Sequence, residues 1–245
     1  MSSEINRFVT GAPQNLTERY AHRASMMKPS EIRSLFAVAS RPDIVSLAGG
    51  MPNLSAFPME MMASVIDKLI KENGQEALQY GNGQGHPKLR EQICEVMALE
   101  GIRAHPDDVI VTTGSQQALD LISRIFLDPN DVVLVEAPSY VGALGTFHQY
   151  EGKVVHVAMD NDGLIPDALR EAIKVTRANG HKIKFLYLIP NYQNPAGVLL
   201  SPERRSEILD ICREEKIFVI FSGKIPMPLP LNLIIRLFVD LSSSR

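Results

Sequence analysis

Three short polar segments of this 245-residue sequence each directly follow an apolar run. They read VTTGSQQALD, EAPSY and IPNYQNPAG. In the first segment, Gly114 permits a tight turn and Ser115 follows at the start of a helical pattern. Backbone N–H groups at a helix start, a serine hydroxyl and the positive end of the helix dipole form an anion site that suits a phosphate. Most such turns bind nothing, so this segment alone leaves phosphate binding open.

The other two segments carry groups that could contact a planar ligand. Tyr140 closes EAPSY, and its ring could lie against an aromatic ligand. A proline turn followed by a partly buried tyrosine is the commoner explanation of that segment taken alone. In the third segment the Asn194 amide could donate to a ligand oxygen, while Pro195 and Gly197 fix the loop. Segments that follow strands of one sheet meet at one edge, where open α/β sheets bind ligands.

Metal and disulfide chemistry have no support in the sequence. The six histidines show no metal-binding spacing, and no metal is expected. The acidic run from Asp160 to Gly163 fails the EF-hand pattern and is better explained as a turn. The two cysteines, Cys94 and Cys212, lie far apart inside helix-like stretches, which indicates a reducing compartment.

Alternating strand and helix patterns after Asp108 predict a mostly parallel sheet covered by helices, that is, an α/β fold. Before that point the pattern is helical, and Gly74 and Gly101 are the expected helix stops. In the later part, Ser201 is the expected cap of one helix, and Asn179-Gly180 closes another. The expected helices are Met59–Lys71, Pro87–Glu100, Pro166–Ala178 and Pro202–Glu215. The expected strands are Val109–Thr112, Val132–Glu136, Val154–Ala158, Lys184–Ile189 and Ile217–Phe221.

Composition and charge bound the classes of function. Hydrophobic residues make up 45% and charged residues 22%, an ordinary globular balance that predicts one large domain. A formal net charge of -3 does not indicate the basic surface that nucleic-acid binding usually needs, so no DNA or RNA partner is expected. The apolar run Ile225–Leu241 is too short and too interrupted by proline to span a bilayer, so no membrane partner is expected. With no signal-peptide core near the N-terminus, a cytoplasmic location is expected, an organelle being left open.

Taken together and in order, the motifs resemble those of one family from about Arg23 to Ile220. They are IVSLAGGMPN with Phe57-Pro58 following, ALQYGNGQGHPKLREQI, VTTGSQQALDLI, VLVEAPSYVG, DGLIPDALREAI and FLYLIPNYQNPAGVLLSPERRSEIL. The sequence resembles the fold-type-I, pyridoxal 5'-phosphate (PLP)-dependent aminotransferases of class I/II. Within them it is similar to the branch that includes the 2-aminoadipate, kynurenine and aromatic aminotransferases. The resemblance implies transfer of an amino group from such an amino acid to a 2-oxo acid, with PLP as electron sink.

The resemblance also implies roles for individual residues. Ser115 and Gln116 would hold the cofactor phosphate, and Tyr140 would stack on the pyridine ring. Asn194 would donate to the ring hydroxyl oxygen. Gly50 would lie beside the substrate carboxylate. Tyr80 would reach into the phosphate site of a second subunit, so a homodimer is implied.

After Ile220 the sequence departs from the family pattern. The family continues with an acidic pair, then a Schiff-base lysine and a carboxylate-binding arginine, none of which has a counterpart here. No catalytic residue is therefore assigned, and the chain is expected to stop before that lysine. Lys224 follows the fifth expected strand directly, a full crossover too early, so we expect it not to form the Schiff base.

The expected architecture is an incomplete PLP-transferase large domain, lacking its last strands and the C-terminal small domain. An N-terminal arm and helix are expected at 1–45, the partial large domain at 46–221 and a divergent hydrophobic tail at 222–245. Missing strands would separate Val109–Thr112 from its neighbours and leave edges unpaired, so poor stability is expected. Leu231–Val239 is expected to occupy part of the vacated groove.

These motifs lead to three hypotheses about function. The first is a PLP-dependent aminotransferase. The second is a non-catalytic remnant, from splicing, a frameshift or a gene-model error, that at most binds PLP or pairs with an intact subunit. The third is a transcription regulator of the same fold, which is disfavoured because the sequence has no basic winged-helix segment before the resemblance begins.

Overall fold

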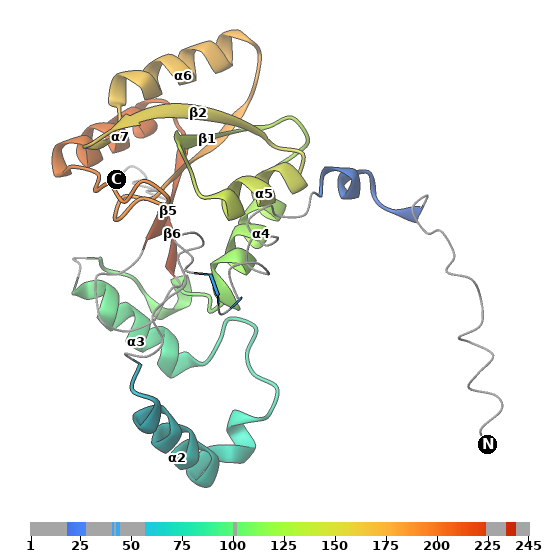
Figure 1. The fold of residues 1–245 in the computed structure, drawn as a ribbon, viewed down its shortest axis with the longest axis vertical. Coiled ribbons are helices and arrows are strands. Elements are labelled where there is room, and N and C mark those ends of the chain that lie inside the picture. The colour runs from blue at the N-terminus through green and yellow to red at the C-terminus, as the bar shows by residue number, and fades with distance from the viewer. Residues whose placement is uncertain are drawn as a thin grey trace, which may run out of the picture. The chain divides into compact units, whose positions relative to one another are not determined.

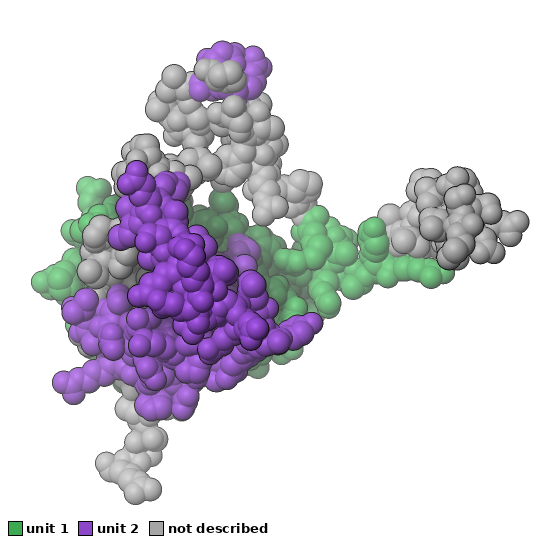
Figure 2. All heavy atoms as spheres, turned by 90° about the horizontal axis from the view of Figure 1, so that it is seen from below, with its two compact units in different colours: residues 1–28, 118–245 green, residues 29–117 purple. Residues whose placement is uncertain are grey.

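The computed structural model describes residues 19–27, 41, 43–44, 57–99 and 102–223, together with the backbone of 234–238. Two compact units make up the chain, and Figure 2 colours them separately. The first unit contains residues 1–28 and 118–245, and the second contains residues 29–117. The sheet predicted from the sequence belongs to the first unit.

Six strands within the described residues form one sheet in the order β3-β2-β1-β4-β5-β6. The four inner strands run parallel to one another, whereas β3 and β6 are antiparallel to their neighbours. The mostly parallel α/β sheet is therefore confirmed. The strands are β1 Val132–Ala137, β2 Lys153–Asp160, β3 Gly163–Leu164, β4 Ile183–Leu188, β5 Phe218–Gly223 and β6 Ile234–Phe238.

Helices cover both faces of this sheet, and its two central strands, β1 and β4, are buried on both sides (Figure 1). On one face, α6 and α7 pack against Leu134 and Leu186. On the other face, α5 and the part of α4 from Ala118 onward pack against Val133 and Tyr187. Successive residues of β1 thus face two apolar layers, which explains its uninterrupted apolar sequence. These helices are α4 Gly114–Phe126, α5 Val141–Gln149, α6 Pro166–Ala178 and α7 Pro202–Glu214.

The capping residues of α6 and α7, which pack on the same face of the sheet, lie where the sequence predicts them. α6 matches its expected bounds and is followed by Gly180, whose φ of +73° is easily adopted only by glycine. α7 begins after Ser201, whose hydroxyl accepts a hydrogen bond from the Arg204 amide at 3.4 Å. The four expected strands of the sheet are confirmed to within two residues at each end.

The outer hairpin of the sheet is held by one arginine. β2 and β3 pair through Asp160 and Gly163, so the acidic run between them is confirmed as a turn. Arg204 on α7 binds both carboxylate oxygens of Asp160, at 2.5 and 2.8 Å, and donates to the Gly163 carbonyl at 2.9 Å. This side-chain hydrogen bonding holds the pKa of Asp160 at about 2, below its usual range. The helix and the turn are thereby fastened together.

At the opposite edge, β6 pairs with β5 in an antiparallel register from Val219↔Phe238 to Gly223↔Ile234. The expected apolar segment Leu231–Val239 therefore contributes a strand beside β5. The backbone groups of β5 that would otherwise form an open edge are thus hydrogen-bonded.

The second unit contains α2 Met59–Ala77, α3 Pro87–Ala98 and the short 3-10 helix η5 Pro106–Asp108. α2 runs past the expected stop at Gly74, but it is kinked there, because Asn73 has non-helical dihedral angles. Gly101 lies outside the described residues. The first unit adds a further 3-10 helix, η3 His22–Met26, whose His22 contacts Glu151 at 2.7 Å. No helix among the described residues is long and apolar enough to cross a membrane.

The predicted strand Val109–Thr112 is wrong. Among the described residues this segment joins no ladder of the sheet. Its Val111 amide instead donates to the Gln84 carbonyl at 2.9 Å, within the second unit. An apolar, β-branched run forms a strand only where a neighbouring strand accepts its hydrogen bonds. Among the described residues this segment has no neighbouring strand. This agrees with the expectation that missing strands leave Val109–Thr112 without its sheet neighbours.

Candidate functional site

Two of the three polar segments leave the sheet at neighbouring strand ends. β1 and β4 are adjacent and parallel, with Val135 opposite Tyr187. The loop that carries Tyr140 follows β1, and the loop that carries Asn194 follows β4. Parallel neighbours end at the same edge, so these two loops share the edge at which open α/β sheets bind ligands. The expected meeting at one edge is thus confirmed for two of the three segments, whereas VTTGSQQALD follows no strand of the sheet within the described residues. The contacts of these segments with a ligand stay predictions.

Tyr140 lies half-buried at the start of α5, with its ring over Gly142. A Cβ atom on residue 142 would lie 2.5 Å from the Tyr140 Cζ and Oη atoms. Only glycine therefore allows the ring to occupy this place. Behind it, Phe147 and Tyr187 meet edge to face with ring centroids 5.6 Å apart. Tyr140 thus packs against a buried cluster that contains both rings.

A buried polar network joins the two loops, and sequence reasoning missed it. Gln193 is 2% exposed, and its Nε2 donates to the Pro138 carbonyl at 2.7 Å and to Glu136 Oε2 at 3.5 Å. Glu136 is 1% exposed, and the same Oε2 accepts from the Ile189 amide at 2.9 Å. The Gln193 Oε1 atom accepts from the Ala196 amide at 2.9 Å. The signal in the sequence was a glutamate that directly follows the apolar run VVLV at a strand end.

Glu136 has an unusual electrostatic environment. Burial raises the pKa of its carboxyl from 4.5 to about 7, and the hydrogen bonds from Ile189 and Gln193 oppose this rise. Among the described residues no ion pair reaches this carboxyl. Burial also raises the pKa of Tyr187, with smaller contributions in the same direction from Tyr140 and Glu136. Burial thus disfavours the charged form of the Glu136 carboxyl.

Ser115 and Gln116 lie in the first turn of α4, in the second unit. Gly114 begins this helix with φ +80°, and a Cβ at that position would meet no atom within 4 Å. The predicted need for glycine in this turn is confirmed, and its backbone is open to a close approach. The Thr113 amide just before the helix is occupied by Gln117 Oε1 at 2.5 Å. The first-turn amides of a helix have no carbonyl partner within it, which suits an anion.

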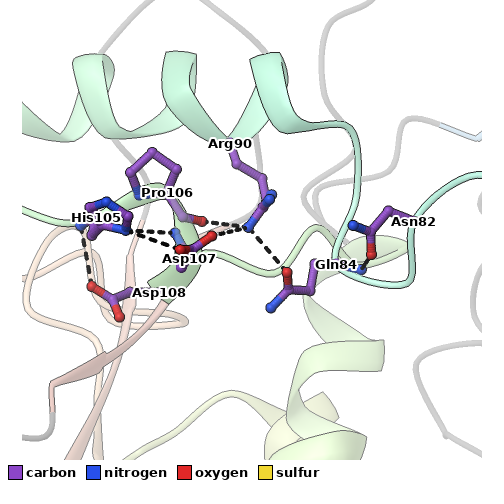
Figure 3. A network of polar contacts seen from close by, with 7 residues as sticks. All are labelled: Asn82, Gln84, Arg90, His105, Pro106, Asp107 and Asp108. Atoms are coloured by element: carbon purple, nitrogen blue, oxygen red, sulfur yellow. Dashed lines mark hydrogen bonds and ion pairs between the residues drawn. The ribbon is translucent and has the colours of Figure 1, made fainter.

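Tyr80 belongs to a glycine-rich loop of the second unit and is fully exposed. The loop is held by Arg90, which is buried on α3 (Figure 3). The Arg90 Nη1 atom donates to the Pro106 carbonyl at 2.8 Å, to Gln84 Oε1 at 3.2 Å and to Asp107 at 3.3 Å. The guanidinium group on α3 thus ties the loop at Gln84 to η5.

Gly50 and Lys224 both lie outside the described residues, so their predicted roles stay predictions. The same holds for the ligand contacts of Ser115, Gln116 and Tyr80, which belong to the second unit. Within the part of the chain that the structure describes, no group of three or more metal-ligating side chains occurs. The shared edge instead offers the ring of Tyr140 and the exposed side-chain amide of Asn194. Such groups suit a planar ring with polar substituents.

Comparison with known proteins gives consistent matches. The family model described as aminotransferase class I and II matches residues 42–222. An aromatic-amino-acid aminotransferase 1 from Thermococcus litoralis is 37% identical over 211 residues, 85% of this chain and 51% of that protein. A 2-aminoadipate transaminase from Thermus thermophilus is 38% identical over 208 residues, 85% of this chain and 50% of that protein.

Among solved structures, a Pyrococcus horikoshii kynurenine aminotransferase in complex with PMP superposes with a TM-score of 0.79 at 36% identity. The match covers 86% of this chain and 52% of that one. The chain therefore spans about half the length of the curated relatives that it matches.

Proposed function

Because the chain belongs to the class I and II aminotransferase family, we propose that the sheet edge at Tyr140 and Asn194 binds the ring of PLP. Ser115 and Gln116 are proposed to bind its phosphate. The observation that carries the proposal is the pair of loops at the ends of β1 and β4, hydrogen-bonded to each other through Gln193. This arrangement presents a tyrosine ring and an exposed amide at one edge.

The residues present fit this cofactor. The Tyr140 ring lies beside Gly142 and is half-buried, so part of the ring is accessible to a planar ligand. Asn194 is exposed and carries an amide donor, which suits an oxygen on the edge of such a ring. At Gly114, the open space beside the backbone would let a phosphate approach the start of α4.

The reaction proposed for the whole protein is amino-group transfer to a 2-oxo acid. PLP, when bound, supplies the electron sink for chemistry at the α-carbon of an amino acid. The proposed donors are 2-aminoadipate, kynurenine or an aromatic amino acid, by similarity to the named relatives. Gly50 is proposed to lie beside the substrate carboxylate, and Tyr80 to reach the phosphate site of a second subunit in a homodimer.

A second candidate function is a PLP-binding chain without transaminase activity of its own, which pairs with an intact subunit. The observation that favours it is the departure from the family pattern after Ile220. The family match ends at residue 222, whereas the sequence continues with a different apolar tail. In this candidate the cofactor is bound by contacts to its ring and phosphate alone.

Titration of the purified chain with PLP, followed by tyrosine fluorescence, tests the cofactor proposal. Tyr140→Ala and Asn194→Ala should each weaken binding about tenfold, the effect of losing one stacking or hydrogen-bonding contact. Tyr192→Ala is the matched control, because Tyr192 is exposed in the same loop and has no proposed contact. Equal affinities for all four proteins would refute the assignment of this edge.

Absorbance of the same samples separates the two candidates. A visible band of lysine-bound PLP that disappears in Lys224→Ala would show that Lys224 carries the cofactor, and would exclude the non-catalytic candidate. Saturable binding without such a band supports that candidate.

A further inference from the structure

The loops that carry Tyr140 and Asn194 are fastened by the side chain of Gln193. Its Oε1 accepts from Ala196 within its own loop, whereas its Nε2 donates across to the Pro138 carbonyl at 2.7 Å. The backbone of Gln193 also closes its own loop, because its amide donates to the Val198 carbonyl at 2.9 Å. One residue therefore helps to close the second loop, through its backbone and its Oε1 atom, and links it to the first through its Nε2 atom.

Glu136 fixes the orientation of that side chain. Its Oε2 lies 3.5 Å from Gln193 Nε2 and 2.9 Å from the Ile189 amide. The Ile189 amide directly follows β4, and Glu136 lies near the end of β1, so this carboxyl ties the two strand ends together. Both side chains are almost completely buried, and burying unpaired amide or carboxyl groups is costly. The bridged arrangement gives the Gln193 amide and the Glu136 Oε2 atom hydrogen-bond partners.

We infer that Gln193, oriented by Glu136, is a positioning residue that sets the separation between Tyr140 and Asn194. The inference rests on the proposed function, because it assumes that both residues contact one ligand. Neither residue of the bridge touches the cofactor in this arrangement. Its contribution is to hold two contact groups on separate loops within the narrow tolerance that binding requires.

Hydrogen exchange of the unliganded chain tests the bridge without any cofactor. Ala143 and Leu144 are the reporter amides, because both donate to the Tyr140 carbonyl, at 3.0 and 3.1 Å, rather than to Gln193. Gln193→Met removes the donor with little change in volume, so exchange at both reporters should accelerate. Amides of α6 should exchange at the wild-type rate, because a local loosening leaves them unaffected. Unchanged exchange at the reporters would overturn the inference.

The second measurement is the affinity for PLP. Gln193→Met and Glu136→Met should each weaken binding about tenfold, as the loss of a buried positioning hydrogen bond predicts. Glu136→Gln should retain most of the affinity, since its amide oxygen can still accept from both donors. Gln75→Met is the matched control, because Gln75 lies exposed on α2.

The outcomes separate the inference from the proposed function. Affinity of Gln193→Met within about twofold of the wild type would overturn the positioning role. Equal losses in Glu136→Gln and Glu136→Met would overturn the part assigned to the acceptor oxygen. If the wild-type chain binds no PLP, the proposed function fails, and exchange at Ala143 and Leu144 alone decides whether the bridge couples the loops.

Discussion

Replacing Glu136 by glutamine should change how the stability of the protein depends on pH. Glu136 is buried at the end of β1, and its pKa is raised from 4.5 to about 7, chiefly by burial. Glutamine has nearly the same shape, and its amide oxygen can accept from the Ile189 amide and from Gln193. The substitution therefore removes the titration and largely preserves the hydrogen bonds.

The size of the effect follows from the two pKa values. Because the folded-state pKa is the higher one, the folded protein binds more protons than the unfolded chain between pH 4.5 and about 7. Its free energy of unfolding should therefore fall as pH rises through this window. A pKa difference of about 2.5 corresponds to about 3 kcal/mol of unfolding free energy. The wild type should lose this amount as the pH rises, and the Glu136→Gln variant should not.

Urea unfolding followed by circular dichroism, at several pH values from about 4.5 to 8, measures this difference. The quantity to compare is the free energy of unfolding of the variant minus that of the wild type, since other titrating groups cancel in it. This difference should rise with pH by about 3 kcal/mol. Glu171→Gln, at an exposed position of α6, is the control and should show no such rise. A difference for Glu136→Gln that stays constant across the range would refute the reasoning.

Three further substitutions or reagents test other parts of the structure. Ser201→Ala should lower the free energy of unfolding by about 0.5–1 kcal/mol in urea titrations, because it removes the N-cap of α7. Phe147→Ala should cost about 3–5 kcal/mol in the same assay, because a fully buried ring is lost from the buried cluster; a cost below about 1 kcal/mol would contradict this packing. A thiol reagent at neutral pH should modify Cys94 long before Cys212, since burial raises the pKa of Cys212 to about 12; equal rates in the folded protein would contradict this burial.

Much of the fold follows from local sequence signals. α6 has its predicted bounds because Pro166 sets its first turn and Gly180 its end. The buried strands were recognisable because an apolar run such as VVLV needs burial on both faces. Val109–Thr112 carries the same kind of local signal and still forms no strand. Strand formation depends on a neighbour that supplies hydrogen bonds, and a local pattern does not contain the neighbour.

The sequence predicted part of the site as well. That Tyr140 and Asn194 would share an edge followed from their places after two parallel strands. The bridge between their loops did not follow, because Glu136 and Gln193 are 57 residues apart in the sequence. Their contact depends on the register of β1 with β4 and on the path of two loops. Residue types and spacing along the chain specify neither of these.

The two outer strands of the sheet have a further consequence, for the way in which copies of the chain can associate. β3 consists of only two residues, Gly163–Leu164, and its turn is clamped by Arg204. So short a strand offers few backbone groups to an incoming chain. β6 has five residues and pairs with β5 in the described sheet, and a strand of this length offers more backbone groups to an incoming strand. If copies of this chain add strand to strand, we expect growth from the β6 side only, which leads to a paired, terminated assembly rather than a continuous fibre.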